Sequence, residues 1–147
     1  MRYLGLDVGD ARIGVALSDE TATLASGLAT LQRSGPRKDL KAVADLVRRH
    51  QSGEVVVGLP RSLDGTLGPQ AEKVLAFMEA LRGMVKVPVV PWDERFTTVV
   101  AQQALIESGV SRRERKEVVD KVSAILILQS YLDYRKTADS EAPKSTA

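Results

Sequence analysis

The order of apolar patterns along the chain constrains its fold more than any other feature of the sequence. Residues 2–9 and 12–18 are short segments rich in Val, Ile and Leu, and only Asp10-Ala11 separates them, which predicts two strands joined in a hairpin. Residues 23–31 predict a third strand. Strands joined by short turns pair antiparallel, so the chain is expected to begin with an antiparallel unit.

Helix and strand patterns then alternate. From Asp39 to about Gly53, apolar residues recur at spacings of three and four, which predicts an amphipathic helix. The apolar run at 54–59 predicts a strand buried on both faces. Further along, the pattern predicts a helix that begins near Ala71 and ends at Gly83, a strand over 87–92, a helix over 97–108, and a final helix over 117–134 that is apolar nearly all round and therefore buried.

This order predicts an α/β fold with a mixed sheet covered by helices on both faces. The chain has 147 residues, which is enough for one domain with a substantial core and too few for a second. We expect that single domain to span residues 1–135. Residues 136–147 are polar and rich in small side chains, which predicts a disordered tail.

Composition excludes several classes of protein. The chain has no cysteine, so a disulfide framework, a thiolate zinc site and a cysteine nucleophile are excluded, and a reducing cytoplasm fits. The first residues include Arg2 and Asp7 and no long apolar segment, which argues against a secretory signal. No apolar run reaches the ~18 residues of a membrane span. We therefore expect a cytoplasmic protein without a membrane partner.

The charges balance in sum but cluster along the chain. There are 21 Lys and Arg against 19 Asp and Glu, a net charge of +2. The stretch from Arg33 to His50 nevertheless holds six basic residues and two acidic ones, and residues 112–116 hold four basic residues and one glutamate. Such clusters fit either a solvated helix face or binding to nucleic-acid phosphates. Six aromatic residues are too few to favour a platform of stacked bases.

Asp7 is unusual because it lies inside a segment that otherwise has the pattern of a central strand. Burying a carboxylate costs free energy unless it is paired, hydrogen-bonded or bound to metal. Side chains alternate along a strand, so Gly5 and Gly9 share the face of Asp7 and are expected to leave room for a hydrated ion and a phosphate. The alternative is an aspartate that ends the strand early and turns into Gly9-Asp10.

Two further carboxylates lie at the ends of predicted elements. Glu94 follows the strand over residues 87–92, and sites in open α/β sheets lie where strands end, although an ion-paired acidic loop would also explain it. Asp120 opens the final helix, where the helix dipole also favours an acid. Ser123 and Ala124 share the face of Asp120, and such small residues would let this face pack close to the sheet.

Three carboxylates of this kind suit divalent-metal phosphoryl transfer. Mg²⁺ is held by a few carboxylates together with waters and phosphate oxygens, and a pair of such ions stabilises the attacking and leaving oxygens. This chemistry requires no histidine, cysteine or lysine base. It therefore suits a chain whose one histidine, His50, lies in the basic helix.

Four motifs in order along the chain together resemble the YqgF/RuvX family. They are Asp7-Val8-Gly9 with Arg12-Ile13-Gly14-Val15-Ala16, Val57-Gly58-Leu59-Pro60 with Asp64-Gly65-Thr66, Asp93-Glu94-Arg95-Phe96-Thr97-Thr98, and Asp120 with Ile127-Leu128-Gln129-Ser130-Tyr131-Leu132. The resemblance covers about residues 1–134. It implies a ribonuclease H-like fold, in which the first three strands of a mixed five-stranded sheet are antiparallel.

The resemblance also implies a site and a reaction. Asp7, Glu94 and Asp120 would be the catalytic acids and would hold two Mg²⁺ or Mn²⁺ ions, and hydrolysis of a phosphodiester would leave a 5′-phosphate and a 3′-hydroxyl. As our own hypothesis beside this resemblance, substrate phosphates would be bound by Arg12, Arg61, Thr97 and Thr98, and the basic helix near Arg48 and Arg49 would extend the groove. Family members are described as nucleases for the 5′ end of precursor 16S rRNA and also as Holliday-junction resolvases. We expect the RNA to be the substrate and keep the DNA junction as the alternative.

Other functions stay open at the level of sequence. An actin- or sugar-kinase-like ATPase shares the Asp-x-Gly hairpin, but such enzymes close two lobes on a nucleotide and this chain has room for one. A non-catalytic RNA-binding assembly factor would keep the fold and the basic surface. A junction resolvase would cut two strands symmetrically and so act as a homodimer, although the sequence has no obvious dimer stripe.

Overall fold

The computed structural model describes residues 1–61, 65–93 and 112–141, and in the last segment it describes the side chains of residues 122–136. Five strands form one sheet in the order β3-β2-β1-β4-β5. They are β1 (Arg2–Val8), β2 (Arg12–Ser18), β3 (Ala25–Gln32), β4 (Ser52–Leu59) and β5 (Val89–Asp93). The first three strands pair antiparallel, and β4 and β5 run parallel to β1. The predicted mixed five-stranded sheet is confirmed.

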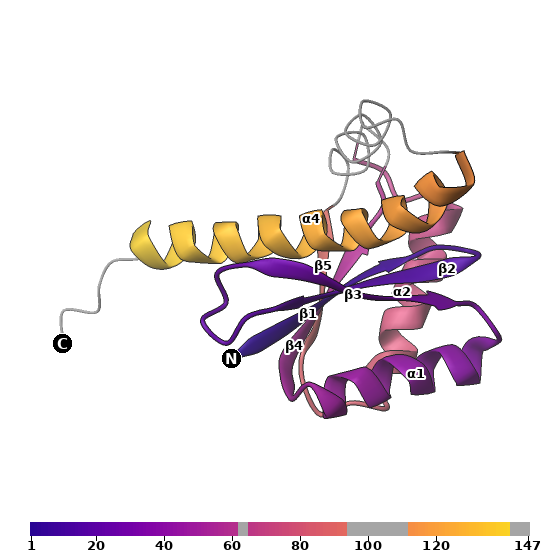
Figure 1. The fold of residues 1–147 in the computed structure, drawn as a ribbon, viewed down its shortest axis with the longest axis horizontal. Helices are drawn as coiled ribbons and strands as arrows, with labels where there is room; N and C mark the ends of the chain where they lie inside the picture. The colour runs from indigo at the N-terminus through magenta and orange to yellow at the C-terminus, as the bar shows by residue number, and fades with distance from the viewer. Residues whose placement is uncertain (62–64, 94–111, 142–147) are drawn as a thin grey trace.

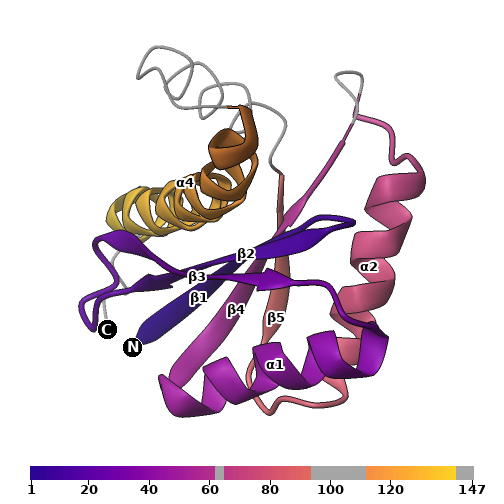
Figure 2. The same cartoon turned by 45° about the vertical axis from the view of Figure 1, so that its right-hand side comes forward.

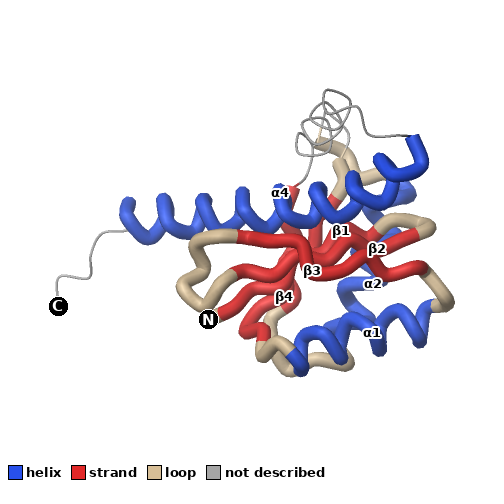
Figure 3. Tube along the Cα trace, in the orientation of Figure 1, coloured by secondary structure: helices blue, strands red, loops and turns tan. Residues whose placement is uncertain are grey.

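Helices cover both faces of the sheet. The described helices are α1 (Pro36–Arg49), α2 (Pro69–Arg82) and α4 (Arg112–Glu141). α1 and α2 lie on one face and α4 crosses the other, as Figure 1 and Figure 2 show. The red strands in Figure 3 lie between these two blue helical layers. Within the described part of the chain, no helix is both long and apolar enough to cross a membrane.

The alternation of side chains on the strands divides the core into two layers. Leu4 and Leu6 of β1 are buried against the α1 and α2 face, whereas Tyr3 packs with Ile127 and Leu128 of α4 on the other face. The side chains of β4 alternate between the two layers in the same way, and no residue of β4 is exposed. Burial on both faces explains the unbroken apolar runs in these strands, over residues 3–6 in β1 and 55–59 in β4.

Close packing of α4 on β1 depends on a residue without a side chain. A Cβ atom at Gly5 would lie 2.7 Å from the Cβ of Leu128 and 3.2 Å from the carbonyl oxygen of Ala124. Backbone and Cβ atoms cannot move away as the end of a flexible side chain can, so even a methyl group at this position would push α4 off the sheet.

We expect Gly5→Ala to lower the free energy of unfolding by roughly 1–3 kcal/mol, because overpacking a tight interface forces backbone shifts of this cost. Gly83→Ala is the matched control, since Gly83 has right-handed helical backbone angles and a Cβ there would make only an ordinary contact at 3.4 Å. Urea unfolding of both variants measures the difference. Equal stability of the two variants would contradict this role of Gly5.

Two predicted helices have the wrong boundaries. α1 begins at Pro36 rather than Asp39, because a proline is well accommodated in the first turn of a helix, and it ends at Arg49, so that Gly53 lies in β4. The final helix runs from Arg112 to Glu141, so residues 136–141, predicted as the start of a disordered tail, are helical.

The prediction that the final helix is buried on all sides is also wrong. Ala124, Ile127 and Leu128 are buried, whereas Asp133 and Tyr134 are exposed. Among the described helices, only α4 lies on this side of the sheet, so only one side of α4 packs against the core. The predicted helix over 97–108 and the last residues of the predicted tail, 142–147, lie outside the described residues.

Candidate functional site

Asp7 lies near the carboxyl end of β1, on the face of the sheet that α4 covers. Tyr3 packs against α4 and Gly5 meets it directly, and alternate residues of a strand share one face. Asp7 is the next residue of that series, and it is half-buried. The carboxylate therefore belongs to the α4 side of the sheet, beyond the point where the helix touches Gly5.

The strands on both sides of Asp7 present glycine at its level. Its partner on β2 is Gly14. On β4 the register pairs Leu6 with Val57, and one further residue along both strands brings Gly58 beside Asp7. The residues directly level with Asp7 on β2 and β4 therefore carry no side chain.

The space beside Asp7 does not come from the glycines that the sequence pattern indicated. Gly5 is filled by close contact with α4, and a Cβ at Gly9 would lie 2.9 Å from the carbonyl oxygen of Arg12 within the β1–β2 turn. The glycines that flank Asp7 on the neighbouring strands are instead Gly14 and Gly58. Strand register, which sequence periodicity does not reveal, decides which glycines flank a side chain.

Two of the predicted phosphate-binding arginines lie at the same edge of the sheet as Asp7. Arg12 is the first residue of β2, directly after the turn that follows β1. Arg61 is exposed and lies two residues beyond the end of β4. Because β1 and β4 are parallel neighbours, their carboxyl ends meet at this edge.

The other two predicted acids are only partly described. Asp120 lies in α4, one helical turn before Ala124, which meets β1 at Gly5. Its side chain falls outside the described residues. Glu94 directly follows Asp93, the last residue of β5, and with Thr97 and Thr98 it lies beyond the described segment. Among the described residues, no group of three possible metal ligands is found.

Arg48 and Arg49 are not brought together with Asp7. α1 begins at Pro36, which shares a pocket with Val8 next to the β1–β2 turn, whereas Arg48 shares a pocket with Ser52 at the start of β4. The two arginines therefore lie at the opposite end of the sheet and on its other face.

Arg33 holds the β1–β2 turn in place, and the sequence did not single it out for this role. Its Nη1 donates to the carbonyl oxygen of Gly9 at 2.7 Å, and its backbone N–H donates to the carbonyl oxygen of Ala11 at 2.9 Å. Its Nε donates to Asp39 Oδ2 at 2.7 Å, and its guanidinium lies over the ring of Phe77 at 5.7 Å. The turn that begins two residues after Asp7 is thereby tied to α1 and α2.

Asp39 completes this arrangement from the first turn of α1. The residue is only 4% exposed, and its Oδ1 accepts a hydrogen bond from the backbone N–H of Ser34 at 2.9 Å. Burial alone would raise its pKa, but the Ser34 N–H and the Arg33 guanidinium outweigh burial and hold the pKa of Asp39 below its usual value. Asp39 therefore remains charged and keeps Arg33 oriented.

We expect Asp39→Asn to lower the free energy of unfolding by about 2 kcal/mol at neutral pH, since the amide places a donor against the Arg33 guanidinium. A depressed folded-state pKa stabilises the protein above the unfolded-state pKa, and this contribution is lost as the pH falls through the folded-state value. The stability difference from the unsubstituted protein should therefore be constant from pH 7 to 5 and shrink below about pH 4. Asp45→Asn, at a more exposed ion pair with Arg48, is the control. A difference that does not depend on pH would contradict the assignment.

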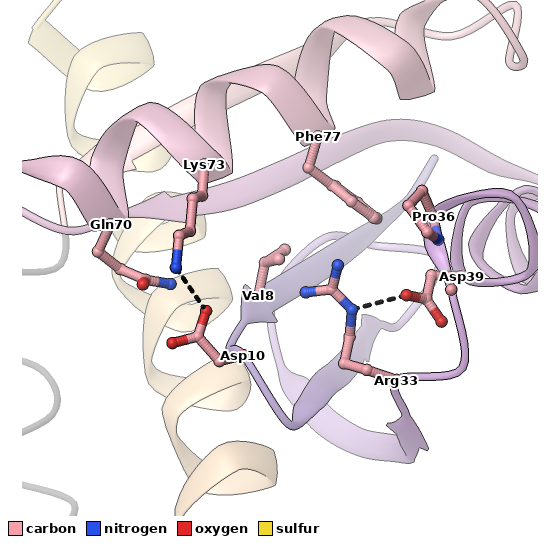
Figure 4. A pocket seen from close by; sticks show the side chains of 9 residues that line it. Val8, Asp10, Arg33, Pro36, Asp39, Gln70, Lys73 and Phe77 are labelled. Carbon is pink, nitrogen blue, oxygen red and sulfur yellow. Dashed lines mark hydrogen bonds and ion pairs between the residues drawn. The ribbon is translucent and has the colours of Figure 1, made fainter.

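A pocket of about 340 Å³ lies beneath the turn, between the N-terminal ends of α1 and α2. Figure 4 shows Arg33 and Asp39 on one side of it and Lys73 with Asp10 on the other. The Lys73–Asp10 pair is 3.4 Å apart and both side chains are largely exposed, so it adds little stability. The pocket is thus the space around the Arg33 contacts rather than a charged site of its own.

Four of the six aromatic residues gather on the α4 face of the sheet. Trp92 of β5 packs against Tyr131 and Tyr134, with ring centroids 5.4 and 5.1 Å apart, and Tyr131 packs against Tyr3. The indole N–H of Trp92 donates to Ser130 Oγ at 2.5 Å. This cluster fixes the end of β5 on α4, and Glu94 is the second residue after Trp92.

A known protein family matches the part of the chain that forms the sheet and the helices on it. The family described as "RuvX: Holliday junction resolvase" matches residues 1–134, which include strands β1 to β5, helices α1 and α2 and most of α4. The chain belongs to the RuvX family. The matched segment contains Asp7, Glu94 and Asp120.

Relatives of this RuvX-family chain carry the name "Putative pre-16S rRNA nuclease". The relative from Thermoanaerobacter pseudethanolicus is 50% identical over 137 residues, which cover 92% of this chain and 99% of the relative. The relative from Caldanaerobacter subterraneus subsp. tengcongensis is 50% identical over 139 residues, which cover 94% of this chain and 100% of the relative.

Two solved structures with a similar fold are junction resolvases. Thermus thermophilus RuvC, in complex with a Holliday junction substrate, has a TM-score of 0.56 at 20% identity and covers 92% of this chain and 96% of its own. The Fowlpox virus resolvase, in complex with Holliday junction DNA, has a TM-score of 0.59 at 14% identity and covers 92% of this chain and 99% of its own. At these identities the likeness shows a shared ribonuclease H-like fold.

Proposed function

We propose that this RuvX-family chain is a divalent-metal-dependent nuclease that hydrolyses phosphodiester bonds at the 5′ end of precursor 16S rRNA. The observation that carries the proposal is the position of Asp7, a half-buried carboxylate between two glycines at the edge where Arg12 and Arg61 also lie. A carboxylate beside cations suits a site that must bind both metal and phosphate. Relatives at 50% identity that are named for pre-16S rRNA support this choice of substrate.

The residues at this edge fit Mg²⁺ or Mn²⁺. Both ions prefer carboxylate and water oxygens, and the strands on both sides of Asp7 carry glycine at its level. Asp120 lies on α4 one turn before its contact with β1, and Glu94 follows the end of β5. We infer that Asp7, Glu94 and Asp120 together hold two such ions. Bound there, the ions lower the pKa of water and neutralise charge on the phosphate.

The chain's own residues position the RNA for this reaction. Arg12 and Arg61 donate N–H groups to phosphate oxygens, and Thr97 and Thr98 donate hydroxyl groups to the same strand. Arg33 acts indirectly. It donates a hydrogen bond to the Gly9 carbonyl oxygen and so limits the movement of the turn that follows Asp7. A nuclease of ribosomal RNA precursors with these features would work in the cytoplasm.

The proposal is tested with a labelled RNA that spans the mature 5′ end of 16S rRNA. We expect the purified protein to cleave it with Mg²⁺ or Mn²⁺, to stop in excess chelator, and to leave 5′-phosphate and 3′-hydroxyl ends. Cleavage in chelator, or products with 2′,3′-cyclic phosphate ends, would show that the RNA's own 2′-hydroxyl is the nucleophile and would exclude the proposed reaction.

Resolution of a DNA four-way junction is the second candidate. The description of the matching family favours it. A resolvase must cut two strands symmetrically, so this function requires a homodimer with two Asp7 edges. Sedimentation of the protein with and without a four-way junction tests this requirement, and a monomer in both states would exclude it.

A further inference from the structure

Helix α1 carries a concentration of positive charge that the proposed catalytic edge does not use. This 14-residue helix holds five of the chain's 21 basic residues but only two of its 19 acidic ones. The rest of the chain therefore has 16 basic and 17 acidic residues. The five are Arg37, Lys38, Lys41, Arg48 and Arg49, and all are exposed. The net positive charge of the protein thus resides on α1.

The basic residues of α1 form one continuous face. At 100° per residue they fall within an arc of about 120°, on the side of the helix opposite the buried Val43 and Val47. Of the two acids in α1, Asp39 turns inward to Arg33, and Asp45 pairs with Arg48. The exposed face of α1 therefore presents five cations and a single carboxylate.

This basic face leads away from the catalytic edge. The N-terminal end of α1 lines a pocket with Val8 and Asp10, beside the turn that follows Asp7. Its last turn lines a second pocket with Ser52, at the opposite end of the sheet. With a rise of about 1.5 Å per residue, α1 spans about 21 Å between them. Figure 1 shows the helix along the side of the sheet that faces away from α4.

The pocket at the C-terminal end of α1 has the features of a ligand site. It encloses about 390 Å³, with Val47 and Met84 among its apolar walls and Arg48 and Lys86 as its cations. Ser52 also lines it, is 5% exposed, and its hydroxyl has no hydrogen-bond partner within the described part of the chain. Buried hydroxyl groups are normally paired, and this oxygen is buried beside the pocket, so a ligand reaches it once the Ser52 side chain rotates toward the pocket. Pockets of at least about 300 Å³ with apolar walls and a few polar groups accept small organic ligands.

We propose that the exposed face of α1 and this pocket, here named the α1 track, bind the RNA substrate beyond the cleaved bond. Arg37, Lys41 and Arg48 lie in one line along the helix and contact successive phosphates of a strand. The pocket takes one unpaired nucleotide, with its base against the apolar walls and its phosphate near Arg48 and Lys86, and the Ser52 hydroxyl rotates toward the pocket to hydrogen-bond it. This inference rests on the proposed function only in taking RNA as the ligand.

Binding to single-stranded RNA in the Asp7→Asn background tests the charged part of the α1 track, because no cleavage is then needed for the readout. We expect Arg37→Gln/Lys41→Gln to raise Kd about tenfold at 0.15 M salt and to reduce the slope of log K against log salt by about 1.4, which corresponds to two lost phosphate contacts. Lys73→Gln/Lys136→Gln removes the same charge from exposed sites outside α1 and should change Kd less than twofold. Equal losses in the two double variants, or no loss in either, would overturn the proposal.

Ser52→Ala tests the pocket with two readouts that move in opposite directions. Burial of the unpaired hydroxyl costs free energy that no hydrogen bond offsets. Its removal should therefore raise the melting temperature of the RNA-free protein. The same variant should bind single-stranded RNA three- to tenfold more weakly and a blunt RNA duplex with unchanged affinity. Unchanged binding of single-stranded RNA would remove the pocket from the track.

These experiments separate the α1 track from the proposed reaction. A protein that shows the predicted binding pattern but cleaves no RNA with any divalent metal would retain the track and contradict the nuclease proposal. A protein that cleaves RNA with metal but binds equally well after Arg37→Gln/Lys41→Gln would retain the nuclease and contradict the track.

Discussion

Asp7→Asn is expected to reduce metal-dependent cleavage of the precursor RNA about 10³-fold or more, which corresponds to roughly 4 kcal/mol of lost transition-state stabilisation. Asparagine has nearly the shape of aspartate but lacks the negative charge that attracts a divalent cation. The flanking residues Gly14 and Gly58 offer no side chain for the new amide to clash with. The melting temperature should therefore stay within a few degrees of that of the unsubstituted protein.

Asp10→Asn is the matched control for this result. Asp10 lies three residues from Asp7, and its carboxylate is 71% exposed and faces Lys73 in a weak ion pair. The same loss of charge at Asp10 should leave the cleavage rate within about twofold, since exposed ion pairs contribute little. Undiminished cleavage by Asp7→Asn, or an equal loss in Asp10→Asn, would remove Asp7 from the metal site.

Glu94→Gln and Asp120→Asn are each expected to reduce cleavage about 10²-fold or more without weakening the binding of RNA. Both acids would hold metal rather than RNA, and the removal of a negative charge near the phosphates should leave Kd unchanged or slightly lower. Cleavage under saturating RNA and fluorescence anisotropy measure the two quantities separately. Asp133→Asn, which changes an exposed carboxylate of α4, is the control.

This pair of variants also distinguishes an enzyme from an RNA-binding assembly factor. If cleavage by the preparation persists in both variants, it comes from another source or another site. If RNA binding falls in parallel with cleavage, the acids support the structure of the binding surface instead of the chemistry.

The order of strands and helices along the chain and the mixed sheet could be predicted because several features of the sequence agree with them. The short separation of the first two segments requires a hairpin, and the apolar run at 54–59 requires burial on both faces, which a strand at the middle of a helix-covered sheet provides. Helix ends were less predictable. α1 begins early at Pro36, and residues 136–141 extend α4 because adding residues to an existing helix costs much less free energy than starting one.

The contacts around Asp7 could not be read from the sequence because they depend on pairing between distant segments. Gly14 and Gly58 flank Asp7 only once the register of three strands is known. Asp39 appears in the sequence as an ordinary acid in the first turn of a basic helix, and Arg33 as one more residue of a basic cluster. Their role in holding the β1–β2 turn depends on the fold, which places the end of β3 beside that turn.

A count of residue types was also a poor guide to clustering. Six aromatic residues in the chain gave no reason to expect an aromatic site, yet four of them lie together on the α4 face. Burial raises the pKa of Tyr131, so its hydroxyl stays protonated and donates to Glu54 Oε2 at 2.7 Å. These rings join β5 to α4. Glu94 directly follows β5, and Asp120 lies in α4.

Cleavage of two substrates by one preparation tests the central claim most directly. A precursor RNA that spans the mature 5′ end of 16S rRNA and a four-way DNA junction are incubated at equal salt with Mn²⁺, with chelator, and with the Asp7→Asn protein in place of the unsubstituted one. We expect the RNA to be cut at least tenfold faster than the junction, with no cutting in chelator or by Asp7→Asn. Faster cutting of the junction would contradict the RNA substrate, and RNA cutting that survives both chelator and Asp7→Asn would contradict the metal site itself.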